Sequence, residues 1–190
     1  MLKKIVLREL EDHFKMRDFM INHKQEILDF AKIVLESLKK GGCIFWCGNG
    51  GSAADSQHLA AELVGRFEKE RKPIKSISLT TDTSILTALS NDYSYEIVFK
   101  RQLQALGKSK DILIAISTSG NSKNVIEVLK EAKKKKIKSL AILGKNGGKA
   151  KKFAYKSIII KSKKTSRIQE MHILIGHIIC QIAEHGTTKG

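Results

Sequence analysis

Short apolar runs alternate with stretches of helical spacing through most of this chain, and that alternation restricts the fold more than any other feature. The clearest run covers residues 111–116, Asp-Ile-Leu-Ile-Ala-Ile. Similar runs lie at 43–47, 76–79, 138–142 and 156–160, and helical spacing is found at 52–66, 83–90, 94–106, 123–136, 149–153 and 165–185. Such runs are typical of strands buried on both faces of a parallel sheet. The sequence therefore predicts an α/β fold, a three-layer sandwich with a five-stranded parallel sheet flanked by helices.

Residues 1–40 precede the first predicted strand. They show helical periodicity without glycine or proline, and we expect two helices with a break near Asn22–His23. Because they come before the sheet, they cannot be crossovers within it. We predict a single domain over 1–190, in which 1–40 form a helical extension that packs against the domain and against other subunits.

The composition gives a net charge of +16, which raises nucleic acid as a partner. The lysines are spread over many segments, and the densest run, Lys133–Lys136, closes a predicted helix, where cations suit the dipole. We therefore expect no nucleic-acid partner but a general attraction for anionic substrates. The chain lacks an apolar run of membrane-spanning length and has charges near its amino terminus, so we expect a cytoplasmic protein with no membrane partner.

The three cysteines are expected to be packing residues. Cys43 and Cys47 flank a predicted strand, where residues four apart lie roughly 13 Å from each other, too far for a disulfide. Cys180 lies on an apolar helix.

A glycine-rich turn, residues 48–52, joins the first strand to a helix that carries polar side chains. Asp55, His58, Glu62 and Arg66 are spaced to lie on one stripe of that helix. His58 and Glu62, four residues apart, have the spacing of two ligands of one metal, or of a surface pair that adds a little helix stability. The turn also nearly matches a dinucleotide-binding pattern, but the candidate acid, Asp82, comes about 30 residues on where about 20 are needed. We therefore disfavour a dinucleotide site.

A second polar loop, residues 117–122, follows the clearest strand and precedes a helix. It reads Ser-Thr-Ser-Gly-Asn-Ser, with four hydroxyl groups. A helix cap needs one hydroxyl, whereas a phosphate uses several hydroxyl and backbone N–H donors together with the positive end of the helix dipole. We favour a phosphate site over a capped helix.

The last predicted helix carries polar side chains off its apolar face: Gln169, His172 and His177, with Gly176 available for close backbone approach. A histidine in such a helix is more often packed or exposed than a ligand, and Ser166 and Gln169 could instead form a capping box. Gln169 and His177 are roughly 12 Å apart along an ideal helix, so one metal reaches both only if each side chain extends towards it.

Three motifs in order make the chain resemble the bacterial phosphoheptose isomerases of the sugar-isomerase domain superfamily over nearly its whole length. They are Gly48-Asn49-Gly50-Gly51-Ser52-Ala53 with Gln57-His58 and Glu62, then Ser117-Thr118-Ser119-Gly120-Asn121-Ser122, then Arg167-Ile168-Gln169-Glu170. The resemblance implies interconversion of sedoheptulose 7-phosphate and D-glycero-D-manno-heptose 7-phosphate, the first step of nucleotide-activated heptose biosynthesis for lipopolysaccharide or capsule. It further implies a homotetramer with interfacial active sites and one zinc per site.

The same resemblance implies roles for individual residues. Glu62 and His177 would be catalytic, and the metal would be held by His58, Glu62, Gln169 and His177. The substrate would be bound by Asn49, Gly50, Gly51, Ser52, Glu62, Asn91, Asp92, Ser117, Thr118, Ser119, Ser122 and Gln169. The alternative is a non-catalytic relative that binds the bacterial replication initiator; those proteins look like versions in which the equivalents of Glu62 and His177 are replaced, and this chain keeps both.

Overall fold

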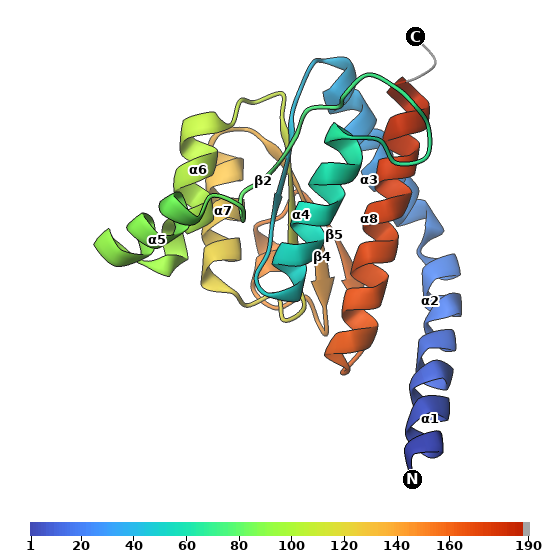
Figure 1. Cartoon of the computed structure of the whole chain (residues 1–190). Helices are drawn as coiled ribbons and strands as arrows, with labels where there is room; N and C mark the ends of the chain where they lie inside the picture. Colours follow the sequence, from blue (N-terminus) through green and yellow to red (C-terminus); the bar gives the residue numbers. More distant parts are fainter. Residues whose placement is uncertain (188–190) are drawn as a thin grey trace.

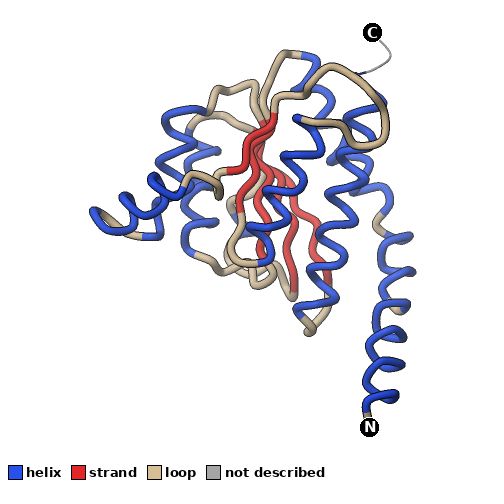
Figure 2. Tube along the Cα trace, viewed as in Figure 1, coloured by secondary structure: helices blue, strands red, loops and turns tan. Residues whose placement is uncertain are grey.

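Five parallel strands form the centre of the computed structural model, which describes residues 1–187 (Figures 1 and 2). They are β1 (Ile44–Cys47), β2 (Ser76–Ser78), β3 (Ile112–Ser117), β4 (Lys138–Gly144) and β5 (Lys156–Ile160), in the order β2-β1-β3-β4-β5. The chain leaves β1 for β2 on one side and returns to place β3 on the other side. The loops after β1 and β3 therefore diverge at a topological switch point, where α/β folds form ligand sites.

Helices cover both faces of this sheet (Figure 1). On one face lie α3 (Lys24–Lys39), α4 (Gly51–Val64) and α8 (Thr165–Thr187), and on the other α6 (Val98–Leu106) and α7 (Lys123–Lys134). Side chains alternate along β1, so that Ile44 and Trp46 pack against α3, α4 and α8 on one face, and Phe45 and Cys47 pack against α6 and α7 on the other. The predicted three-layer sandwich is confirmed.

The remaining elements are short. The helix α5 (Thr83–Asp92) projects away from the sheet, capped at its start by Asp82, whose carboxylate accepts the N–H of Ile85 at 2.8 Å (Figure 1). The 3₁₀ turn η1 (Tyr95–Ile97) forms the start of the predicted helix 94–106, which α6 continues, and the 3₁₀ turn η2 (Ala150–Lys152) lies where a short helix was predicted at 149–153.

Most predicted boundaries hold within two residues, but the end of α4 matters for the site. The helix ends at Val64, and Gly65 follows as its C-cap, so Arg66 lies beyond the helix. The prediction that Arg66 shares the polar stripe of Asp55, His58 and Glu62 was wrong, because glycine readily ends a helix.

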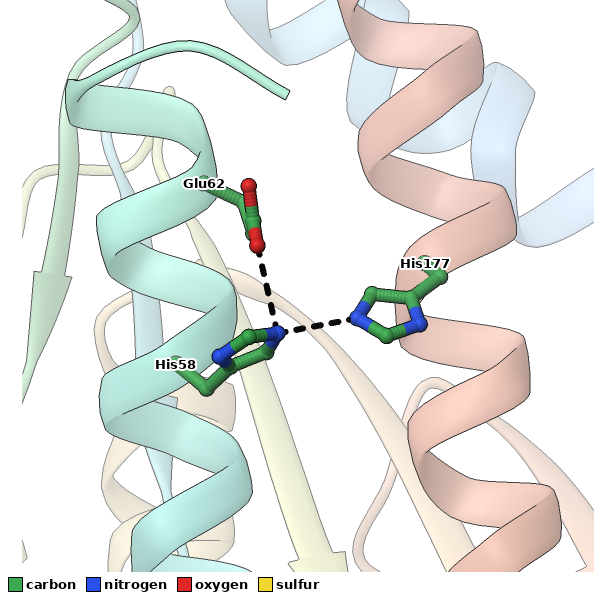
Figure 3. Close-up of side chains that lie close together, drawn as sticks. All are labelled: His58, Glu62 and His177. Carbon is green, nitrogen blue, oxygen red and sulfur yellow. Dashed lines mark hydrogen bonds and ion pairs between the residues drawn. The ribbon is translucent and has the colours of Figure 1, made fainter. Parts of the chain in front are cut away.

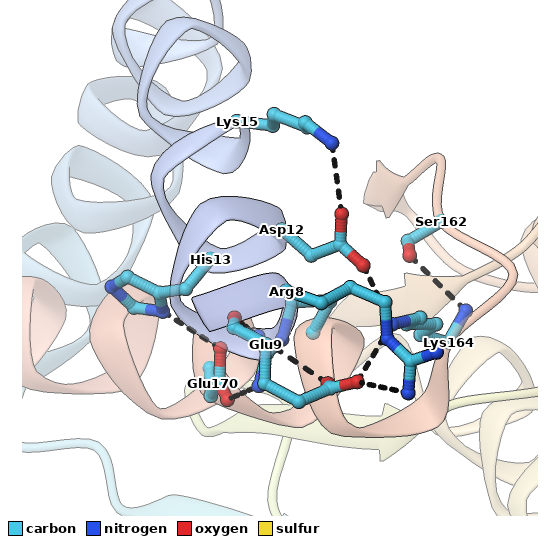
Figure 4. A network of polar contacts seen from close by, with 9 residues as sticks. Arg8, Glu9, Asp12, His13, Lys15, Ser162, Lys164 and Glu170 are labelled. Atoms are coloured by element: carbon cyan, nitrogen blue, oxygen red, sulfur yellow. Dashed lines mark hydrogen bonds and ion pairs between the residues drawn. The ribbon is translucent and has the colours of Figure 1, made fainter. Parts of the chain in front are cut away.

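The amino-terminal extension forms α1 (Leu2–Phe14) and α2 (Met16–Asn22) before α3. The predicted break is present at His23, and a second interruption at Lys15 was not predicted. A polar network fastens α1 to the start of α8 (Figure 4). In it, Lys164 donates to Glu9 at 2.9 Å and to Asp12, while Glu170 bonds His13 at 2.8 Å.

The helix α1 also exposes apolar side chains to solvent. Its exposed apolar residues are Leu2, Ile5, Val6, Leu7, Leu10 and Phe14. Leu7, Leu10 and Phe14 lie three and four residues apart on one side of this helix, turned away from Glu9 and Asp12, and each is at least half exposed. None of the helices in this range has the length and hydropathy needed to cross a membrane.

All three cysteines are free thiols. Burial raises the pKa of Cys43 to about 11, with help from Asp111, and also raises the pKa of Cys47 and of Cys180. A thiol held protonated is a poor nucleophile, so the prediction of packing residues is supported.

Candidate active site

The helices α4 and α8 lie side by side and bring their polar side chains together. They pack closely at Gly176, where a Cβ would lie 2.3 Å from Cδ1 of Leu59. Only glycine permits this approach, as the sequence predicted. The thiol of Cys180 also lies 3.7 Å from the carbonyl oxygen of Leu59. The neighbouring residues His58 and His177 consequently face each other across the two helices.

His58, Glu62 and His177 form a compact cluster (Figure 3). The Nε2 atom of His58 lies 3.0 Å from Nε2 of His177 and 3.2 Å from Oε1 of Glu62. One donor atom from each residue lies within 4.8 Å of the others, so the cluster could hold a metal ion. Ligand atoms of one tetrahedral metal ion with bonds near 2.0–2.1 Å lie about 3.3 Å apart, close to the two distances from His58.

The electrostatic setting of the cluster favours a neutral imidazole at His177. Burial lowers the pKa of His177, the nearby His58 lowers it further, and Glu62 opposes both. One turn earlier on α4, burial raises the pKa of the Asp55 carboxyl, against the influence of His58. Metal binding and proton acceptance both need an imidazole nitrogen without its proton.

Gln169 lies at the other end of the paired helices. A Cβ on Gly51 would lie 2.2 Å from Nε2 of Gln169, so the amide rests directly on the first residue of α4. Gly51 is therefore needed for this close approach. Within one subunit, Gln169 contacts the glycine turn, and it lies eight positions before His177 on α8, roughly 12 Å along the helix.

The glycine turn is tied to the far side of the switch point through Asn49. The side-chain amides of Asn49 and Asn124 bond reciprocally at 2.9 and 2.8 Å, and the hydroxyl of Tyr95 donates to Asn49 at 3.1 Å. Asn124 lies in the first turn of α7, directly after the hydroxyl-rich loop. The turn after β1 and the loop after β3 thus form one continuous edge. Gly50 and Ser52 belong to the same edge, with Gly50 as N-cap of α4 and Ser52 buried.

The hydroxyl groups of the loop 117–122 do not cap α7. Ser122 is the N-cap residue, but its side chain makes no capping bond. Ser117 and Ser119 instead accept the N–H groups of Gly120 and Asn121, each at 3.1 Å. A hydroxyl that accepts a hydrogen bond still has its proton to donate, which favours an anion site over the helix-cap alternative.

Asn91 and Asp92 lie apart from these groups. Both are exposed at the end of α5, and the amide of Asn91 donates to the carboxylate of Asp92 at 2.9 Å. They do not contact the histidine cluster within one subunit. Their role in substrate binding stays a prediction.

His172 differs from its prediction. The sequence placed it off the apolar face of the last helix, but it is fully buried, and burial lowers its pKa to about 4. The stripe of α8 that meets the sheet is wider than the isoleucine pattern indicated, so His172 packs against the core instead of joining His177.

Sequence reasoning missed several neighbours of the predicted site. Asn124 and Tyr95 bond Asn49, and the ring of Phe67 lies against the ring of His177 with centroids 5.6 Å apart. Each comes from another element or loop, so no local spacing reveals it. The strand order alone could have suggested Asn124, because the start of α7 lies at the switch point.

The fold and this site define a class of proteins. Residues 14–144 match the family model described as the SIS domain, which covers more than half of the chain. The chain therefore belongs to the SIS domain proteins.

The similar proteins narrow that class. A phosphoheptose isomerase of Campylobacter jejuni is 51% identical over 95% of this chain and 97% of its own length. Two solved phosphoheptose isomerases share the structure. That of Neisseria gonorrhoeae has a TM-score of 0.92 at 37% identity, covering 97% of this chain and 100% of that one. That of Francisella tularensis has a TM-score of 0.94 at 32% identity, covering 97% and 99%. The chain belongs to the phosphoheptose isomerase family.

Proposed function

We propose that this protein interconverts sedoheptulose 7-phosphate and D-glycero-D-manno-heptose 7-phosphate in heptose biosynthesis. The observation that carries the proposal is the meeting of Glu62 and His177 with His58 across α4 and α8, in a chain of this family. The catalytic residues of the proposal are Glu62 and His177. A relative that only binds the replication initiator would not need this pair.

The reaction moves a proton between C1 and C2 of the sugar. Glu62 removes the proton from one carbon, which leaves an enediol, and returns a proton to the other carbon. A second proton moves between the oxygens on C1 and C2, and His177, whose lowered pKa favours the neutral imidazole, transfers it. The net change is the exchange of a carbonyl and a hydroxyl group, with no redox partner.

We further propose that the metal is zinc. His58, Glu62 and His177 supply nitrogen and oxygen donors of the kind that zinc prefers, at a suitable spacing. When bound, zinc polarises the substrate carbonyl or hydroxyl oxygen. A carboxylate bound to zinc is a weaker base, so Glu62 does not act as ligand and base at the same instant. Gln169, proposed as the fourth ligand, lies far along α8 from His177, and a Gln169 from a second subunit would relieve that separation.

The substrate phosphate is proposed to bind the loop of Ser117, Thr118, Ser119 and Ser122. These hydroxyls lie between β3 and the amino terminus of α7, where the helix dipole favours an anion. The loop also borders an open cavity of about 730 Å³ whose wall carries Lys145, Lys161 and Lys163. Positive charge on this side supports a phosphorylated ligand. The sugar end of the substrate would then lie over residues 49–52, and Asn91 and Asp92 would also bind the substrate.

We infer a homo-oligomer, and propose a tetramer with interfacial sites. The exposed Leu7, Leu10 and Phe14 on one side of α1 support this, because Glu9 and His13 already fix α1 to Lys164 and Glu170 within the subunit. A second copy of this chain would cover such a surface, while a free monomer would leave it in water. The distance between Gln169 and His177 supports the interfacial site.

The test offers sedoheptulose 7-phosphate to the protein in heavy water and follows the aldose by NMR. Three samples are compared: protein as purified, protein treated with a chelator, and treated protein with zinc restored. We expect turnover with deuterium at the reacting carbon, loss on chelation and recovery with zinc. Turnover unaffected by chelation would reject the metal, and no turnover in any sample would reject the reaction and favour the initiator-binding alternative.

A further inference from the structure

A buried ion pair joins the last part of α8 to the segment that follows α4, and the proposed chemistry does not use it. Glu184, near the end of α8, is 1% exposed, and Nε of Arg71 lies 3.4 Å from its Oε1. The Arg71 side chain is 3% exposed. Burying two charges is costly unless each is well compensated, so such a pair marks a position that the fold specifies closely.

Glu184 binds the loop that follows α4. Its carboxylate accepts the backbone N–H groups of Phe67, Glu68 and Lys69, each at 3.1 Å. Three consecutive amides directed at one carboxylate fix the path of the chain there. The ring of Phe67 then lies against His177, with an interplanar angle of 34°. Glu184 thereby positions the Phe67 ring beside His177.

Arg71 binds the last turn of α4. Its guanidinium donates to the carbonyl oxygens of Glu62 at 2.7 Å and Gly65 at 2.8 Å. The last carbonyls of a helix lack partners within the helix, so Arg71 supplies what this end needs. The residue whose carbonyl it holds is the proposed base and metal ligand itself.

We propose that Glu184 and Arg71 are positioning residues that hold Glu62 and His177 at the spacing needed for metal binding and proton transfer. The inference rests on the proposed function. One ion pair reaches both sides of the site, Glu62 through its carbonyl and His177 through the ring of Phe67. A change at Glu184 therefore alters the distance between α4 and α8 at the cluster, although Glu184 touches neither substrate nor metal.

The experiment measures zinc affinity by competition with a chromophoric chelator, in the wild type and in Glu184→Gln. Loss of a residue that supports metal ligands typically weakens metal binding by about 10- to 100-fold. We expect a loss in this range, a similar fall in kcat, and a KM for sedoheptulose 7-phosphate that changes little. With Co²⁺ in place of zinc, the visible absorption spectrum of the variant should change, which reports altered ligand geometry.

Asp111→Asn is the matched control. Asp111 is a buried carboxylate, 5% exposed, that also accepts two backbone N–H groups, those of Cys43 at 2.9 Å and Lys108 at 2.7 Å. Its partners lie at the start of β1 and in the loop before β3, away from α4 and α8. This control should lower the melting temperature and leave zinc affinity and the Co²⁺ spectrum unchanged.

The outcomes separate the two proposals. Zinc affinity and spectrum unchanged in Glu184→Gln, in a wild type that binds metal and turns over, would overturn the positioning role. A wild type that neither binds zinc nor turns over would reject the proposed function instead. If Glu184→Gln does not fold, Phe67→Ala removes the ring against His177, and unchanged zinc affinity in that variant would overturn the role equally.

Discussion

Replacing Gly51 by alanine tests the site without disturbing the core. The new Cβ would meet Nε2 of Gln169 at 2.2 Å, and that atom is the free end of a flexible side chain. The amide must turn aside, at a cost of about 0.5–1.5 kcal/mol if it leaves a rotamer minimum. Alanine in a helix is favoured over glycine by up to about 1 kcal/mol, which offsets this cost. We expect a melting temperature within about 4 °C of the wild type.

Activity should respond far more strongly. A hydrogen bond to a charged group contributes about 1.5–3 kcal/mol, so displacing Gln169 from substrate or metal should lower kcat/KM by about 10- to 150-fold. The assay is conversion of sedoheptulose 7-phosphate at saturating zinc, alongside thermal unfolding followed by circular dichroism. Turnover within about twofold of the wild type would refute the role of Gln169.

A double-mutant cycle identifies the route of the effect. If Gly51→Ala acts only through Gln169, the double variant Gly51→Ala/Gln169→Ala should be no slower than Gln169→Ala alone. If the two single variants' losses in kcat/KM multiply in the double variant, that result would contradict this route and indicate that the new methyl group meets the substrate directly.

Two further predictions concern stability and assembly. The pKa of His172 is lowered from 6.5 to about 4, so between these values the unfolded chain binds a proton that the folded chain does not, and stability falls as pH falls. Lowering the pH from 7 to 4 should therefore reduce the free energy of unfolding by about 3 kcal/mol through His172. In urea unfolding, His172→Gln should lack this part of the pH dependence, and an equal pH dependence in the two proteins would exclude the contribution of His172. Leu10→Glu, on the exposed apolar side of α1, should reduce the assembled mass in analytical ultracentrifugation, whereas Glu11→Lys on the same helix should not. A wild-type protein that is only monomeric would contradict the proposed homo-oligomer.

The sheet and the main helices could be predicted because their signals are local. Apolar runs such as 111–116 need both faces covered, and this alone indicates a parallel sheet with helices. His58 and Glu62 could be grouped because they lie one turn apart on the same helix.

The pairing of helices could not be predicted, because it depends on which residues of α8 meet α4. The sequence showed His172 and His177 as similar polar positions, yet the contact of Gly176 with Leu59 turns one into the core and the other to the cluster. The contacts of Phe67 and Glu184 likewise join segments more than a hundred residues apart. Only the resemblance to a known family indicated that His177 belongs with Glu62.

The central claim is that Glu62 transfers the proton between C1 and C2. The measurement is NMR of sedoheptulose 7-phosphate in heavy water with Glu62→Gln, beside the wild type, both confirmed as folded by circular dichroism. We predict that the wild type forms the aldose with deuterium at the reacting carbon, and that Glu62→Gln forms none while keeping the wild-type fold. Near-normal turnover by Glu62→Gln would contradict the assignment.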